Sequence, residues 1–223
     1  MAADVERIVF SSTCATYGIP ETLPITEATP QQPVNPYGHS KLIFEGILQW
    51  YAGIHGLQPV IFRYFNAAGA SSQFGEHHRI ESHLIPNILF AAQGRQGTIK
   101  IFGDDYDTPD GTAIRDYIHV LDLASAHRLA VESSLTGAFN LGTGKGHSVK
   151  EVIEACRAVT GRPIATETCP RRAGDPPRLV ASIEKAQRIL GWQPQFTDVA
   201  ETIRTAWEWH ESHPEGYGDC HTP

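Results

Sequence analysis

The feature that most constrains the fold is a succession of an apolar segment, a segment with helical periodicity and a second apolar segment. Residues 7–12 and 59–64 each have the composition of a buried strand. Between them, residues 37–55 carry apolar side chains at helical spacing, namely Ile43, Ile47, Trp50 and Ile54. A strand, helix and strand of these lengths predict two parallel neighbouring strands in an α/β sheet.

Beyond Asn66 the pattern predicts an alternation of helices and short strands. We expect helices at residues 83–93, 121–133, 148–160, 182–190 and 198–210, and strands at 98–102, 138–141 and 164–168. Ser148 and Glu151 have the spacing of a capping box, which predicts a helix start at that point. Only the last few residues are expected to lack fixed structure.

A phenol and an ammonium lie one helical turn apart, on Tyr37 and Lys41. A cation about 4 Å from the phenol, at an effective dielectric of about 20, favours the phenolate by roughly 4 kcal/mol. Thr13 adds a hydroxyl at the end of the first apolar segment. These three groups are typical of a proton-transfer site, although Tyr37 and Lys41 alone are equally compatible with an ordinary amphipathic helix start.

Further short segments occur in the same order as in a known family. They are residues 11–18 (SSTCATYG), 35–41 (NPYGHSK), 62–66 (FRYFN), 101–103 (IFG), 110–112 (DGT), 115–120 (RDYIHV), 140–144 (NLGTG) and 171–175 (RRAGD). Together they make the chain resemble the extended short-chain dehydrogenase/reductase family, and within it the UDP-hexose 4-epimerases. The resemblance runs from about Arg7 to about Tyr217.

The resemblance implies an α/β fold that combines the C-terminal part of a Rossmann-like parallel sheet with a smaller α+β substrate-binding domain. Residues 1–66 would form the C-terminal half of the NAD-binding domain, with segments near 115–160 returning to it, and residues 67–223 would form mainly the UDP-sugar domain. Family members begin with a strand, a glycine-rich turn and a helix that bind the dinucleotide pyrophosphate, and the sequence starts downstream of that unit. We therefore expect a C-terminal fragment. Gly142, Gly144 and Gly146 are interpreted as a tight turn, because the third-glycine spacing of a phosphate-binding loop is missing.

The activity implied by the resemblance is 4-epimerisation of UDP-glucose and UDP-galactose with tightly held NAD. Tyr37, helped by Thr13, would remove the proton of the sugar 4-hydroxyl while hydride passes to NAD, and the sugar would take the hydride back on its other face. Lys41 would hold the nicotinamide ribose, and Phe65 would support the nicotinamide. The expected cofactor contacts are therefore Thr13, Tyr37, Lys41 and Phe65.

The residues that the resemblance places around the UDP-sugar are Asn66, His83, Leu84, Lys100, Phe102, Arg115, Tyr117, Arg172, Asp175 and Leu179. Guanidinium groups suit a diphosphate, and the Asp175 carboxylate suits ribose hydroxyls. His83 stands where relatives often carry Asn. By their residue types alone, Arg172 could be a solvated surface residue, and Phe102 and Leu179 could be core residues.

Several alternatives remain at this point. The substrate could instead be a UDP-N-acetylhexosamine, a UDP-uronic acid or a UDP-pentose, and the chain could be a catalytically inactive fragment. A 4,6-dehydratase is disfavoured, because such enzymes need an acidic pair beside the hydroxyl residue and Cys14 and Ala15 follow Thr13 here. Cys14 is interpreted as a small core residue.

Composition narrows the partners and the compartment. The formal charge of −7 argues against nucleic acid as a partner, and no apolar stretch approaches the length of a membrane span. The four cysteines lack paired metal spacing, which favours reduced thiols in a cytoplasm. The eleven histidines, His77 and His78 among them, lack a recognised ligand spacing, so we expect no metal. A homodimer is expected for the full-length protein.

Overall fold

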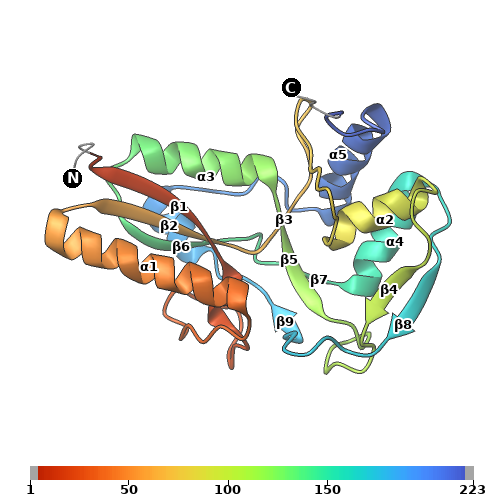
Figure 1. The fold of residues 1–223 in the computed structure, drawn as a ribbon, viewed down its shortest axis with the longest axis horizontal. Helices are drawn as coiled ribbons and strands as arrows, with labels where there is room; N and C mark the ends of the chain where they lie inside the picture. The colour runs from red at the N-terminus through yellow and green to blue at the C-terminus, as the bar shows by residue number, and fades with distance from the viewer. Residues whose placement is uncertain (1–4, 219–223) are drawn as a thin grey trace.

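The computed structural model describes residues 5–218. Cys220 and the expected disorder of the last few residues lie outside this range. Figure 1 shows two groups of helices and strands, one around α1 and α3 and one around α2, α4 and α5, with β5 running between them.

The first group is built on a parallel three-stranded sheet. Its order is β1 (Arg7–Thr13), β2 (Gln58–Tyr64) and β6 (Gly137–Leu141). The β1–β2 register runs from Arg7 opposite Gln58 to Thr13 opposite Tyr64, so both strands end at the same edge. This confirms the parallel pair predicted from the sequence. The two crossover helices, α1 (Pro36–His55) and α3 (Val120–Glu132), cover opposite faces of the sheet (Figure 1).

Local sequence fixes both ends of α1. The Asn35 side chain accepts a hydrogen bond from the Gly38 amide at 2.8 Å, and Pro36 occupies the first turn, where no amide donor is needed. Gly56 ends the helix with φ 70°, in the left-handed region that glycine tolerates. The helix start therefore places Tyr37 beside the ends of β1 and β2.

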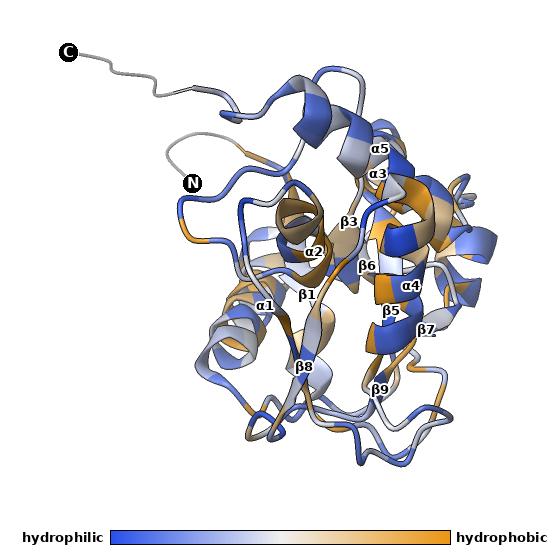
Figure 2. Cartoon of the chain, turned by 90° about the vertical axis from the view of Figure 1, so that its right-hand side faces the viewer, coloured by the Kyte–Doolittle hydropathy of each residue, from blue (hydrophilic) through white to orange (hydrophobic). Residues whose placement is uncertain are grey.

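The second group has its own apolar core. Helices α2 (Leu84–Ala92), α4 (Val149–Thr160) and α5 (Val199–Ser212) pack against one another and against β4 (Ile99–Phe102). Strand β8 (Thr166–Cys169) pairs in parallel with β4. In Figure 2, α2 is mostly hydrophobic, whereas α4 alternates hydrophobic and hydrophilic residues, as expected for a half-buried helix. The capping box predicted at the start of α4 is confirmed, with Ser148 and Glu151 each accepting the other's amide.

Short strands around β5 (Ile114–His119) connect the two groups. Strand β5 pairs in parallel with β3 (Asn66–Ala68) and β9 (Arg178–Leu179), and antiparallel with β7 (Gly146–Ser148). A short 3₁₀ helix, η1 (Cys14–Tyr17), follows β1. The sequence pattern did not predict these short elements.

The helix expected at 182–190 is wrong at its start and in its type. Regular helical bonding is largely confined to a π-helical segment, η2 (Ala186–Leu190). The reason is that Ala181 forms a parallel bridge with Ile25, and the Ser182 amide donates to the Ile25 carbonyl at 2.7 Å, which keeps the chain extended there. The strand expected at 164–168 lies at Thr166–Cys169.

None of the described helices combines the length and the apolar character that crossing a bilayer requires.

Candidate active site

The phenol, ammonium and hydroxyl groups noted in the sequence lie at the carboxyl end of β1. Tyr37 is exposed in the first turn of α1, and Lys41 follows one turn later. Lys41 Nζ donates to the Ser11 carbonyl at 3.0 Å and lies 5.7 Å from the centroid of the Tyr37 ring. Thr13 is buried, and its Oγ1 accepts the Ala15 amide at 3.1 Å, which starts η1. The ammonium is therefore fixed near the phenol by a strand carbonyl.

A second tyrosine lies next to the group of Thr13, Tyr37 and Lys41, which we call the Tyr37 corner. Tyr64 lies opposite Thr13 on β2, and its hydroxyl is 2.8 Å from Ser11 Oγ and 2.7 Å from His127 Nε2. Burial raises the pKa of Tyr64, and the hydrogen bond with Ser11 opposes that rise. This chain of three polar groups ties β1, β2 and α3 together behind the site. No sequence pattern indicated His127 as part of this site, because its partner Tyr64 lies far away in the chain.

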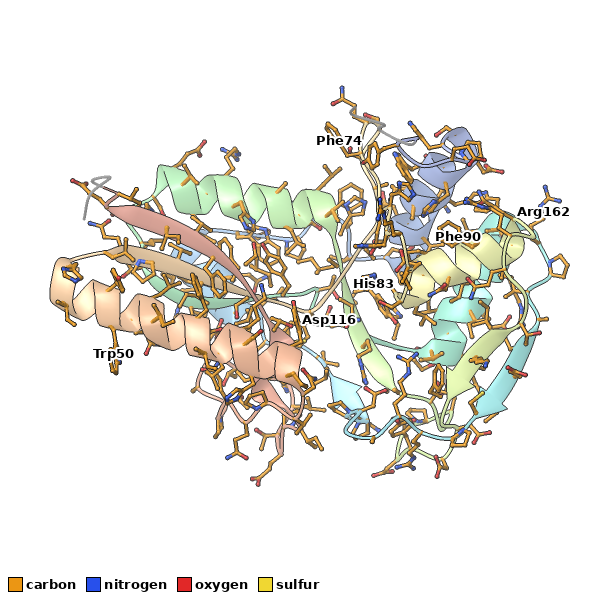
Figure 3. All side chains as sticks on the ribbon, in the orientation of Figure 1. Trp50, Phe74, His83, Phe90, Asp116 and Arg162 are labelled. Carbon is orange, nitrogen blue, oxygen red and sulfur yellow. The ribbon has the colours of Figure 1, made fainter. Side chains whose placement is uncertain are left out.

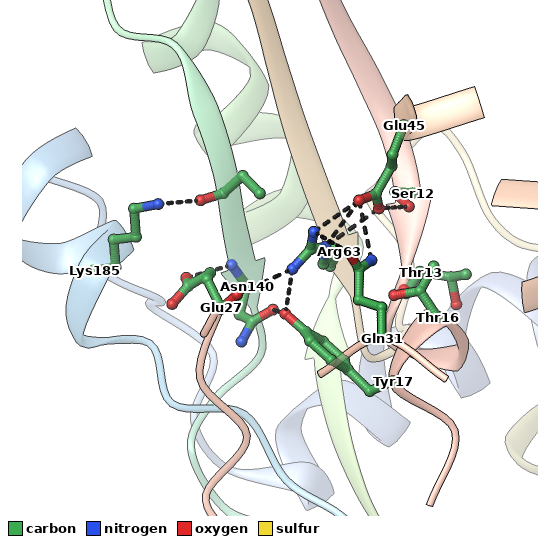
Figure 4. A network of polar contacts seen from close by, with 11 residues as sticks. Ser12, Thr13, Thr16, Tyr17, Glu27, Gln31, Glu45, Arg63, Asn140 and Lys185 are labelled. Atoms are coloured by element: carbon green, nitrogen blue, oxygen red, sulfur yellow. Dashed lines mark hydrogen bonds and ion pairs between the residues drawn. The ribbon is translucent and has the colours of Figure 1, made fainter. Parts of the chain in front are cut away.

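A buried ion pair lies beneath the same corner (Figure 4). Arg63 Nη2 on β2 donates to Glu45 Oε2 on α1 at 2.7 Å, and both side chains are almost fully buried. Arg63 also donates to the Tyr17 hydroxyl at 2.8 Å and to Gln31 Oε1 at 2.9 Å. Ser12 Oγ donates to Glu45 Oε1. Burial raises the pKa of Tyr17 to about 12, against the nearby positive charge of Arg63. The network thus fixes the strand immediately before Thr13.

A second cluster contains the residues expected at the diphosphate and ribose. Arg115 on β5 donates to the Asp175 carboxylate, and the Arg172 guanidinium lies 3.9 Å from the centroid of the Phe102 ring. Tyr117, two residues beyond Arg115, is buried, and burial raises its pKa. The structure adds Tyr106, whose buried hydroxyl has no hydrogen-bond partner among residues 5–218. A buried phenol without a partner is a candidate donor to a bound ligand.

An apolar cluster links the two sites. Cys14, Phe65 and Leu179 are all buried and belong to one hydrophobic cluster. Leu179 lies opposite Arg115 in the β5–β9 register. Burial raises the pKa of the Cys14 thiol to about 12, which confirms the interpretation of Cys14 as a core residue. Phe65 and Leu179 therefore lie between the Tyr37 corner and the Arg115 cluster.

The other expected substrate residues are more dispersed. Asn66 lies opposite Tyr117 in the β3–β5 register. Lys100 is exposed on β4, with its Nζ 3.9 Å from Glu167 Oε1. His83 and Leu84 lie at the start of α2. A hydrogen bond to Glu76 is the main reason why the pKa of His83 is raised to about 9.

The turn at Gly142–Gly146 binds a carboxylate of the chain itself. The Asp116 carboxylate accepts hydrogen bonds from the amides of Thr143 at 2.7 Å, Gly144 at 3.0 Å and Ala181 at 3.1 Å. Because these amides are already paired, the turn offers no cradle for a pyrophosphate. This turn is therefore a structural one, as the sequence spacing predicted, and not a phosphate-binding loop.

Comparisons with known proteins find similar sequences and similar structures. The model of the NAD dependent epimerase/dehydratase family matches residues 1–142. The UDP-glucose 4-epimerase of Halalkalibacterium halodurans is 56% identical over 220 residues, which cover 96% of this chain and 66% of that protein. A crystal structure of a UDP-glucose 4-epimerase is 50% identical with a TM-score of 0.93, covering 98% of this chain and 68% of the other. The enzyme of Bifidobacterium longum, crystallised with NAD+ and UDP, is 40% identical with a TM-score of 0.91, covering 96% and 66%. The chain thus spans about two thirds of the length of these relatives.

Proposed function

Because the chain belongs to the NAD dependent epimerase/dehydratase family, we propose that it forms the catalytic and substrate-binding part of an enzyme that interconverts UDP-glucose and UDP-galactose. The observation that carries the proposal is the placement of Tyr37 and Lys41 at the strand end that also holds Thr13, in a chain 56% identical to a UDP-glucose 4-epimerase. The UDP-sugar and NAD are the ligands that this proposal assigns.

The proposed catalysis rests on proton transfer by this chain. NAD, when bound, supplies a reversible hydride acceptor for C4 of the sugar. Tyr37 takes the proton from the 4-hydroxyl and returns it to O4 once the sugar has turned its other face, and Thr13 orients that hydroxyl. Lys41 stabilises the phenolate and holds the nicotinamide ribose, and Phe65 packs behind the ring. Cofactor binding also requires the glycine-rich unit that the family resemblance places before this part.

The proposed substrate side follows the second cluster. Arg115 and Arg172 bind the diphosphate of UDP, and Asp175 binds the ribose. Asn66, His83, Leu84, Lys100, Phe102 and Tyr117 complete the nucleotide side, and Leu179 borders the sugar. We also propose that the sheet of β1, β2 and β6, with α1 and α3, belongs to the cofactor domain, and that the core of α2, α4 and α5 belongs to the substrate domain.

The exposed face of α1 supports a homodimer of the complete protein. Ile43, Ile47, Trp50 and Ile54 lie on the outside of the helix, and Trp50 is 76% exposed. Figure 3 shows Trp50 pointing away from the rest of the chain. An apolar helix stripe of this kind is typical of a subunit interface. Trp50→Glu should convert a dimer to a monomer in sedimentation velocity, and an unchanged dimer would exclude this face. The free cysteines of the described part, Cys14, Cys156 and Cys169, support a cytoplasmic location.

The activity is tested by completing the chain. The chain is fused behind the N-terminal third of the Halalkalibacterium halodurans relative, and UDP-glucose formation from UDP-galactose is followed with a coupled dehydrogenase. Turnover of UDP-galactose supports the proposal. A folded fusion that binds NAD and leaves UDP-galactose unchanged would exclude it, and turnover of a UDP-uronic acid, UDP-pentose or N-acetylated sugar alone would reassign the substrate.

A further inference from the structure

The segment between β3 and α2 gathers two carboxylates and two imidazoles. Glu76, His78, Glu81 and His83 each offer one ligand atom, and these four atoms all lie within 4.8 Å of one another. Glu76 Oε1 is 3.0 Å from His78 Nε2 and 2.8 Å from His83 Nδ1. Glu81 Oε1 is 2.8 Å from the same His83 Nδ1. Four potential ligands from eight consecutive residues therefore converge on one point.

The buried carboxylate of Glu81 lacks a full set of partners. Its side chain is only 5% exposed. Its Oε1 accepts hydrogen bonds from the amides of Ser82 and His83 as well as from the His83 ring. Its Oε2 is buried and has no hydrogen-bond partner among residues 5–218. Leaving a carboxylate oxygen desolvated and unpaired is costly, so this oxygen is available to bind a cation.

We propose that Glu76, His78, Glu81 and His83 bind a divalent transition-metal ion, with zinc as the best fit. Two imidazole nitrogens and two carboxylate oxygens suit zinc better than magnesium or calcium, which prefer oxygen ligands alone. Ligands at about 2.0–2.1 Å around a tetrahedral ion are about 3.3 Å apart. This value lies between the shortest contacts of the cluster, 2.8–3.0 Å, and the 4.8 Å within which all four ligand atoms lie. The His78 and His83 side chains are 48% and 53% exposed, so an ion can enter from solvent.

This site was not expected from the sequence. His83 is also one of the residues that the epimerase proposal places on the nucleotide side, but the tests below measure metal binding and not turnover, so the two proposals can fail separately. The order Glu-x-His-x-x-Glu-x-His matches no ligand spacing considered above, because the chain must fold back to bring Glu76 to His83. The ion would fix the β3–α2 connection, since His83 is the residue immediately before α2. It would also fix Glu76, which borders the small cavity lined by Pro86, Ala206 and Trp209.

The test measures metal binding on the whole chain after treatment with a chelator. Zinc is titrated by calorimetry, and cobalt is titrated by its visible absorption. We expect one ion per chain and a cobalt spectrum without the sulfur-to-metal band of a cysteine site. His78→Ala and Glu81→Gln should each weaken zinc binding by about tenfold or more. His77→Ala is the matched control, because His77 adjoins the cluster but lies outside it, and it should bind zinc like the parent chain.

The outcomes separate the proposal from adventitious binding to other histidines or to cysteines. No saturable zinc binding, equal affinity in His78→Ala and the parent, or a thiolate band in the cobalt spectrum would each overturn the site. His78 is half exposed, so its loss is compatible with folding, and circular dichroism checks that directly. If Glu81→Gln does not fold, the comparison of His78→Ala with His77→Ala decides alone.

Discussion

At the scale of single residues, the reaction depends most on Tyr37. In the completed chain, Tyr37→Phe should lower epimerase turnover by about 10² to 10⁴, because a positioned general base contributes about that factor. The fold should not change, since the Tyr37 side chain is exposed. Tyr51→Phe, on the same helix, is the control and should keep the parent turnover in the coupled assay. Turnover of Tyr37→Phe within threefold of the parent would exclude Tyr37 as the base.

Leu179 is the residue at which we expect substrate range to be set. The resemblance places it beside the sugar C2 substituent, where some relatives carry a bulky tyrosine. Overfilling a pocket costs about 1 to 3 kcal/mol, or about 10- to 200-fold in discrimination. Leu179→Tyr should therefore cut turnover of UDP-N-acetylglucosamine by about tenfold or more and spare UDP-glucose. Equal losses on both sugars would indicate that Leu179 only packs with Cys14 and Phe65.

The sequence could place Tyr37 and Lys41 on one helix face because both lie in one periodic segment. It could not identify the partners of Arg63. A buried arginine must be paired, but Glu45, Tyr17 and Gln31 come from three other segments, and only the fold brings them together. The cluster at Glu76 was missed for a different reason. Its members are close in the sequence, but the irregular backbone between β3 and α2 brings them together, and no periodic spacing indicates that.

At the scale of elements, the ion pair of Glu45 and Arg63 joins α1 to β2. Arg63→Met should lower the free energy of unfolding by about 3 to 5 kcal/mol, because Glu45 would remain buried without its charge partner. Urea unfolding measures this loss. Glu45→Met combined with Arg63→Met should cost less than the sum of the two single changes, since neither charge then remains. Additive losses in the double variant would show that the two side chains do not stabilise each other.

His119 joins α3 to α5 and should make the fold sensitive to acid. Its Nδ1 accepts the Leu121 amide at the start of α3, and its Nε2 is 3.0 Å from Thr205 Oγ1 on α5. Burial lowers the pKa of His119 below its ordinary 6.5, so the folded protein binds fewer protons than the unfolded chain. This contribution to stability is present above pH 6.5 and is lost as the pH falls below it.

The variant His119→Asn tests this pH dependence. Asparagine can still cap α3 but does not titrate, so the melting temperature should fall less between neutral and acidic pH than in the parent. Absolute stability should drop in the variant, because a buried ring is lost. Parallel pH profiles of parent and variant would contradict a role for His119. The reference for this comparison is His55→Asn at the end of α1, which should keep the parent profile.

Elements with their own amphipathic pattern were predictable, and those defined by distant partners were not. Helix α4 shows both its apolar stripe and its capping box in the sequence. Strand β5 exists because β3, β7 and β9 pair with it from three other parts of the chain. The start of η2 is set by Ile25, more than one hundred residues away. Pairing between distant segments therefore determines the positions of β5 and η2, which sequence periodicity did not predict.

At the scale of the whole molecule, the first sheet has an open edge. Within residues 5–218, β1 pairs with β2 on one side only. Ile8, Val9 and Phe10 are apolar residues of this edge, and an apolar edge strand promotes pairing between chains. The stripe on α1 can close into a symmetric dimer, but an edge strand can add chains without a limit. The mass of the assembly should therefore distinguish association through α1, which stops at a dimer, from association through the edge of β1, which does not.

We expect the isolated chain to form assemblies larger than a dimer and to bind no stoichiometric NAD. Light scattering after size-exclusion chromatography should show a mass that grows with concentration. The chain completed with the N-terminal third of a relative is the matched comparison, because a neighbouring strand then covers β1 and removes the template for further pairing. It should stop at the dimer and retain NAD. An isolated chain that stays a monodisperse monomer would show that the edge of β1 does not promote association. An isolated chain that carries bound NAD and epimerase activity would show that the N-terminal third of a relative is not needed for the cofactor.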